Sequence, residues 1–144
     1  MANIFDVAKY ILGNIGEITT MKLQKLCYYS QVISYKEKNK SLFNEDFEAW
    51  SNGPVCRELF NIHKGKFYLT GRDIPNNLLT NLTDEEKSVI NKCIEEYGRH
   101  SGAELSSMTH QEEPWLNARK DIKDSQNCNR KISKRIIREY YRNN

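Results

Sequence analysis

Glycine and proline are scarce in this sequence, with seven glycines and three prolines among 144 residues. Because both residues interrupt helices and shape turns, their scarcity favours long helices over many short strands. No stretch approaches the roughly 20 apolar residues of a membrane-spanning helix. The N-terminal sequence MANIFDVAKYILGNIGE also lacks the basic start and the unbroken apolar run of a signal peptide. We therefore expect a cytoplasmic protein with no membrane partner.

The usual motifs of enzymes and metal sites are missing as well. The cysteines are far apart, without the C-x-x-C pair of a zinc or redox site: Cys27, Cys56, Cys93 and Cys128. No H-E-x-x-H, G-x-S-x-G, P-loop or G-x-G-x-x-G pattern occurs. We predict a protein that is not an enzyme, holds no metal ion and needs no cofactor.

A small enzyme built on cysteine or histidine remains an alternative. Cys56 or Cys93 would act as the nucleophile and His110 as its base, because catalytic partners need to meet only in the fold. A metal-dependent version would use a different set of side chains: His100, His110 and Glu112 or Glu113. Nothing next to either thiol in the sequence activates it, and the second set has no motif spacing, so buried structural roles are favoured.

Apolar residues recur at helical spacing through most of the chain. The spacing predicts helices at about 4–12, 20–38, 54–65, 83–97, 101–108, 114–118 and 133–141. The helix at 20–38 is expected to be the central core helix, because its apolar surface is wider than a single stripe. Its lysines, Lys25 among them, fall largely outside the main apolar face. Two capping boxes, Thr83 with Glu86 and Ser101 with Glu104, mark helix starts. A short extended piece is expected at 47–50 and an irregular excursion at 66–82. The predicted class is mainly α: a compact single-domain helical fold with five to seven helices and at most a short β-hairpin.

Charge is concentrated near the C-terminus. Residues 119–144 carry nine Lys or Arg and three Asp or Glu, a net charge of +6, whereas the rest of the chain carries −3. Such a segment attracts an acidic partner or nucleic acid, or it is simply the solvated face of a helix. The apolar residues of the last predicted helix fall on one side and suit docking to the core: Ile136, Ile137, Tyr140 and Tyr141. No helix-turn-helix is evident, so direct nucleic-acid binding is not favoured.

Both tryptophans stand beside chain reversals. Trp50 precedes Asn52-Gly53-Pro54, and Trp115 follows Pro114. Large aromatic residues at such corners usually close the core, and when exposed they are typical binding hot spots. His110, in SSMTHQEEPW, either ties its turn together or faces a partner.

Three segments together resemble a known family: TTMKLQKLCYYSQ, FEAWSNGPVCRELF and ELSSMTHQEEPWLNAR. Their order and spacing are similar to the Panacea domain family, which includes SocA-like antitoxins and the phage-associated GepA proteins. The resemblance assigns residues 1–144 to a single domain of this type. Cys27 stands where an aliphatic residue is usual, and residues 66–81 match nothing in the family pattern.

The resemblance implies the antitoxin of a toxin–antitoxin system, often carried by a prophage. Such a protein neutralises its cognate toxin by direct protein contact, and one branch of the family instead delivers the toxin to an ATP-dependent protease. Both mechanisms remain open here. A phage-associated nucleic-acid-binding regulator is the main alternative function.

On this basis we expect the partner to bind at two corners of the fold, at residues 50–57 and 110–119, with the basic C-terminal helix steering its approach. Buried structural roles stay open for the tryptophans and for His110, Glu113 and Arg119. The candidate partner-binding residues are Trp50, Arg57, His110, Glu113, Trp115, Arg119, Arg135 and Arg138.

Overall fold

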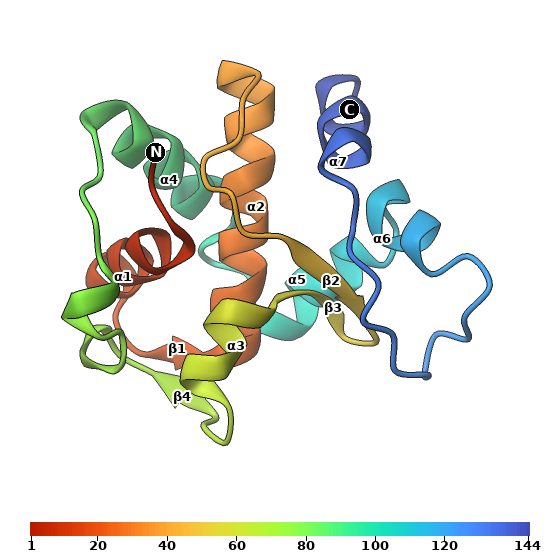
Figure 1. Ribbon diagram of the computed structural model, residues 1–144, viewed down its shortest axis with the longest axis horizontal. Coiled ribbons are helices and arrows are strands. Elements are labelled where there is room, and N and C mark those ends of the chain that lie inside the picture. Colours follow the sequence, from red (N-terminus) through yellow and green to blue (C-terminus); the bar gives the residue numbers. More distant parts are fainter.

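The computed structural model describes all residues from Met1 to Asn144. Seven helices dominate it: α1 (Ile4–Ile15), α2 (Thr20–Lys38), α3 (Arg57–His63), α4 (Asp84–Tyr97), α5 (Gly102–Thr109), α6 (Glu113–Ala118) and α7 (Lys134–Arg142). Four short strands accompany them: β1 (Ile18–Thr19), β2 (Phe47–Trp50), β3 (Gly53–Cys56) and β4 (Tyr68–Leu69). The predicted fold class is confirmed, with a second small sheet besides the expected hairpin (Figure 1). None of the helices is both long and apolar enough to cross a membrane.

Helix α2 forms the centre of the molecule, as its pattern predicts. Every residue from Leu23 to Tyr35 is buried, so this helix is covered on all sides. Helices α1, α4, α5 and α7 all pack against it, and Figure 1 shows α1 and α4 on one side and α7 on the other. One cluster of 31 buried residues forms the core and includes residues from both ends of the chain.

Local capping signals are confirmed. The capping boxes of Thr83 with Glu86 and of Ser101 with Glu104 are both present, at the starts of α4 and α5. The side chain of Ser133 accepts a hydrogen bond from the Ile136 amide and caps α7. Each of these signals involves side chains and backbone within one helical turn, which explains why the sequence alone reveals them.

The predicted start of the third helix at Pro54 is wrong. Residues Gly53–Cys56 form strand β3, which pairs antiparallel with β2, and α3 begins only at Arg57. Gly53 has a φ of 109°, which is incompatible with a helix. Pro54 lies opposite Ala49, whose amide donates to the Arg130 carbonyl instead. The missing N–H of Pro54 therefore leaves no ladder group unpaired.

The segment predicted to be irregular contains one short strand. Tyr68 and Leu69 form β4, which pairs antiparallel with Thr19 and Ile18 of β1. Two short 3-10 turns follow, at Gly71–Asp73 and Asn76–Leu78, as the chain passes α1. The rest of the segment is a loop, as expected.

Candidate protein-binding site around the hairpin

The β2–β3 hairpin is held by side chains that bind its backbone. Five carbonyl groups of the hairpin each accept a hydrogen bond from a different side chain. The donors and acceptors are Arg119 Nη1 to Ala49 (2.7 Å), Trp115 Nε1 to Trp50 (2.8 Å), Ser106 Oγ to Asn52 (2.5 Å), Lys25 Nζ to Pro54 (3.1 Å) and Gln24 Nε2 to Cys56 (3.1 Å). These donors come from α2, α5, α6 and the residue after α6, so distant segments converge on one hairpin.

Gln24 and Lys25 bind the β3 side of the hairpin. The side-chain amide of Gln24 makes two hydrogen bonds with the Cys56 backbone: Nε2 donates to the carbonyl, and Oε1 accepts from the backbone N–H at 2.8 Å. Lys25 is only 1% exposed and has no carboxylate partner, and burial lowers the pKa of its ammonium group to about 7. Its stem lies so close to Gly53 that a Cβ there would sit 2.7 Å from Lys25 Cε. Any other residue at Gly53 would therefore have to displace the Lys25 side chain and would be strained by the positive φ.

Arg119 binds the β2 side and anchors the following loop. Its side chain is 3% exposed and donates not only to Ala49 but also to the carbonyls of Lys123, Asp124 and Gln126. The guanidinium carbon lies 5.1 Å from the centre of the Trp115 ring. Beyond this loop, residues 130–132 run along β2, because the Arg130 carbonyl accepts from Ala49 and the Ile132 amide donates to Phe47.

His110 packs against Trp115, one of the donors to the hairpin. Its ring stacks on Trp115 with the centroids 4.0 Å apart, and it is half-buried. Burial lowers the pKa of His110, and its Nε2 is buried with no hydrogen-bond partner. The imidazole is therefore neutral near pH 7 and packs mainly as a flat apolar group.

The exposed face of the hairpin carries a small cluster of aromatic and charged groups. Arg57 donates to Glu48 Oε1 at 2.9 Å, and Trp50 Nε1 donates to the same oxygen at 2.8 Å. Burial alone would raise the pKa of the Glu48 carboxyl group, but the hydrogen bonds from Arg57 and Trp50 outweigh this effect and lower the pKa. The Arg57 guanidinium lies 5.0 Å from the centre of the Trp50 ring. The three side chains hold one another in fixed positions.

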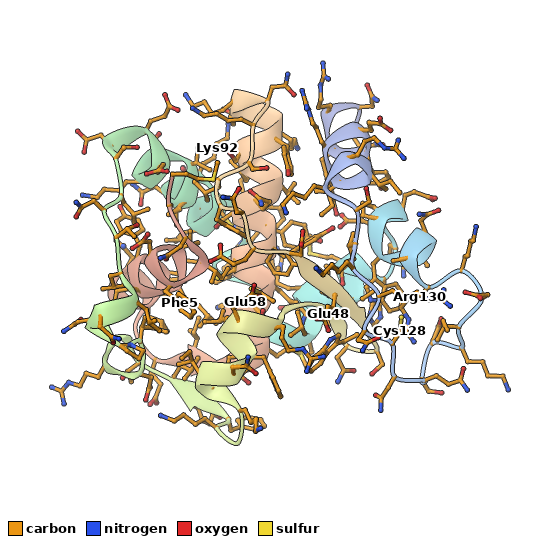
Figure 2. The ribbon with its side chains drawn as sticks, in the orientation of Figure 1. Phe5, Glu48, Glu58, Lys92, Cys128 and Arg130 are labelled. Carbon is orange, nitrogen blue, oxygen red and sulfur yellow. The ribbon has the colours of Figure 1, made fainter.

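A hollow of about 450 Å³ opens next to this cluster. It is lined by Trp50, Arg57 and residues 127–129 of the loop that Arg119 anchors. Figure 2 shows Glu48, Cys128 and Arg130 at the same end of the molecule, beside the hairpin. The hollow thus combines a tryptophan, an arginine and polar loop residues, on a hairpin backbone held by buried side-chain donors.

The structure separates the predicted contact residues into three groups. Trp50, Arg57 and the exposed Glu113 lie on the surface of the hairpin, α3 and α6, and half-buried His110 stacks on Trp115 of α6. Trp115 and Arg119 are buried and support this surface from inside. The last two, Arg135 and Arg138, are exposed on α7 and line a different depression, at the end of α2. Whether any of them contacts a partner stays a prediction.

Several residues that build the site escape the sequence patterns. Lys25 reads as one of several lysines outside the main apolar face of α2 but is buried, and Gln24 is buried beside it. Glu112 reads only as a possible metal ligand, yet its Oε1 accepts hydrogen bonds from Tyr29 (2.7 Å) and Tyr141 (2.6 Å). This carboxylate therefore joins α2 and α7 to the start of α6. No local signal marks these roles, because the partners lie far away in the chain.

The structure gives no support for the alternative catalytic sets. No group of three or more His, Cys, Asp or Glu side chains is arranged to hold a metal ion, so His100, His110, Glu112 and Glu113 form no such site. The thiols of Cys56 and Cys93 are buried, and burial raises the pKa of each to about 12. Both thiols are therefore protonated at neutral pH and are poor nucleophiles.

The comparison with protein families identifies one family. The family described as "Antitoxin SocA-like, Panacea domain" matches residues 23–116, which is more than half of the chain. The chain belongs to this family. The matched span includes four of the five donors to the hairpin and the whole hairpin itself. Family membership supports an antitoxin-type, non-enzymatic role and implies a toxin partner in general terms. No curated protein and no solved structure matches the chain.

Proposed function

We propose that this protein is the antitoxin of a toxin–antitoxin pair and neutralises its cognate toxin by direct protein–protein contact in the cytoplasm. The contact surface of this proposal is the exposed face of the hairpin with its hollow. It is made by Trp50, Arg57 and residues 127–129, with His110 and Glu113 at its edge. Stable complexes bury about 1,200–2,000 Å² in total, so these residues would form the centre of a larger interface.

The fixed hairpin is the observation that carries the proposal. A surface whose backbone is held by five buried donors loses little conformational entropy when a partner binds, which raises affinity. Tryptophan and arginine are among the residues most enriched in binding hot spots. Trp50 and Arg57 both reach the solvent from that rigid support.

The proposal extends the family domain over residues 1–144. The core includes Ala2 at one end and Ile137 and Tyr141 at the other, outside the matched span. Removing α1 or α7 would expose this core. The proposal accordingly treats the chain as one working unit.

Co-expression tests the proposal. The protein is produced with the product of its neighbouring gene, and growth and co-purification are scored together. We expect the neighbour to be toxic alone, harmless with this protein, and recovered with it as a stoichiometric complex. Rescue with disappearance of the neighbour would instead indicate delivery to an ATP-dependent protease. A neighbour that is harmless alone and does not bind would contradict the antitoxin role.

A charge reversal then tests the surface itself. Arg57→Glu places a carboxylate next to Glu48 at the hollow, and we expect loss of rescue and of co-purification because like charges repel at a binding surface. The matched control is Arg99→Glu, an exposed arginine without an ion pair between α4 and α5, which should rescue normally. A second variant, Asn129→Arg, fills the hollow without touching the ion pair. Full rescue by both hollow variants would place the interface elsewhere.

A further inference from the structure

A second depression lies between the C-terminal end of α2 and helix α7. It has a volume of about 720 Å³ and includes residues from the start of the chain, the end of α2 and α7. Figure 1 shows α7 standing beside the C-terminal half of α2. Five of its lining residues are basic and one, Glu139, is acidic; the basic ones are Lys40, Lys134, Arg135, Arg138 and Arg142. We call this depression the basic groove.

The positive charge of the basic groove is only partly compensated. Lys40 pairs with Glu85 at 3.0 Å, Lys134 with Asp46 at 2.6 Å and Arg135 with Glu139 at 3.3 Å. Neither Arg138 nor Arg142 has a carboxylate within ion-pair distance, and both are exposed. Arg138 is nevertheless oriented, because its Nε donates to Asn39 Oδ1 at 2.9 Å.

The two unpaired arginines belong to a row of like charges along α7. Lys134, Arg138 and Arg142 are spaced four residues apart, so they lie on one face of the helix at intervals of about 6 Å. Like charges at this spacing repel each other and destabilise a helix. The adjacent face of α7 packs against the core through Ile137 and Tyr141, both buried, whereas Ile136 and Tyr140 are half-buried. A bound segment with carboxylates at a similar interval would relieve the repulsion.

The surroundings of the groove favour a polypeptide over a nucleic acid. Glu139, Glu85 and Asp46 are interleaved with the cations and would repel a continuous phosphate backbone. The one aromatic lining residue, Tyr35, is 3% exposed and offers no ring on which a base could stack. Separate carboxylates on a protein segment can instead approach Arg138 and Arg142 individually.

We propose that the basic groove binds an acidic segment of a partner protein, with carboxylates about 6 Å apart seated on Arg138 and Arg142. Side chains at every fourth position of a helix have this spacing. That the segment belongs to the neutralised toxin rests on the proposed function. It would form a second contact, separate from the hairpin surface.

Fluorescence anisotropy with the full chain tests this directly. The probe is a labelled helical peptide with glutamate at every fourth position, and the comparison probe carries glutamine at the same positions. We expect saturable binding of the glutamate peptide alone, weakened by salt. The variant Arg138→Gln/Arg142→Gln should lower the affinity by at least about tenfold, since the loss of even one charged hydrogen bond costs about that factor.

A matched variant controls for total charge. Lys64→Gln/Arg72→Gln removes two exposed cations near β4, outside the groove, and should leave peptide affinity unchanged. Equal binding by the groove variant and the wild type would overturn the proposal. So would preferential binding of a labelled single-stranded oligonucleotide, which would make nucleic acid the occupant. If the peptide binds as expected but no neighbour is neutralised, the groove stands and only the toxin assignment fails.

Discussion

The two small sheets of this protein are built in different ways. The β2–β3 hairpin has four residue pairs, its carbonyls are bound by five side chains, and every residue of β3 is buried. The β1–β4 sheet has two residue pairs. The side chains of Phe67, just before β4, and of Tyr68, within it, are 70% and 56% exposed. Both sheets reach the core, but the second does so only through its Ile18–Leu69 pair and otherwise lies at the surface, between α1 and the loop after α3.

The difference shows where a helical protein can place a rigid surface. A two-residue sheet has too few contacts to define a shape, but a hairpin fixed by buried donors resists distortion. Each buried carbonyl left without a partner would cost about 1–3 kcal/mol. The hairpin is therefore tied to the stability of the whole fold, and the following variants separate the two sheets.

Arg119→Ala should have the largest effect on stability. It removes the donor to the buried Ala49 carbonyl and frees the loop that forms the hollow, so we expect the free energy of unfolding to fall by about 4 kcal/mol. Urea unfolding followed by tryptophan fluorescence measures this. The control Arg130→Ala breaks an exposed ion pair with Asp121 and a long, exposed hydrogen bond to the Ala118 carbonyl, and should cost less than about 1 kcal/mol. Equal losses would mean that Arg119 does not hold the hairpin.

Gly53→Ala tests the close approach of α2 to the hairpin. The added Cβ would lie 2.7 Å from Lys25 Cε and 3.0 Å from Thr109 Oγ1, at a positive φ, so we expect a loss of about 3 kcal/mol. Gly65, which precedes β4, has a φ of +86°, but no neighbouring atom lies within 4 Å of the position that a Cβ would take. Gly65→Ala should therefore cost only the backbone strain, about 1 kcal/mol. Similar losses of unfolding free energy for the two variants would show that contact with Lys25 and Thr109 does not add to the cost at Gly53.

Lys25 should give the fold a pH dependence on the alkaline side of neutrality. Its pKa is about 7 in the folded state and 10.5 when unfolded. At pH values between these two, Lys25 is protonated in the unfolded state and neutral in the folded state. Stability therefore rises with pH from about 7, by about 1 kcal/mol per pH unit. Raised pKa values of buried cysteines, whose ordinary value is 9.0, reverse the trend at higher pH. Urea unfolding between pH 7 and 9 should show this slope in the wild type and a flat line in Lys25→Met.

The smallest effect is expected in the second sheet. Phe67→Ala and Tyr68→Ala truncate side chains that are mostly exposed, so each should change the free energy of unfolding by only about 0.5 kcal/mol. The same urea titrations measure it. A loss comparable to that of Gly53→Ala would show that the β1–β4 sheet is as strongly coupled to the core as the hairpin, and the contrast between the sheets would disappear.

The sequence predicts the helices well where the signal is local. The capping boxes at Thr83 and Ser101 and the burial of α2 follow from residues within a few turns of each other. The candidate site is predicted less completely. Trp50 and Arg57 lie at the predicted corner, where Arg57 is exposed and Trp50 half-buried. Pro54 is misread as a helix start, and Lys25, expected outside the main apolar face of α2, is buried.

Amino-acid order alone therefore determined that the chain is mainly helical, that α2 is its centre and that three segments carry the family pattern. These features depend on periodicity, capping and residue type, which act over short distances along the chain. The tertiary structure decided that Gly53 and Pro54 form a strand, that Lys25 and Arg119 turn inward, and that a row of cations on α7 faces a groove. Each of these depends on partners many residues away, since a buried donor is stabilised only by the carbonyl that folding brings to it.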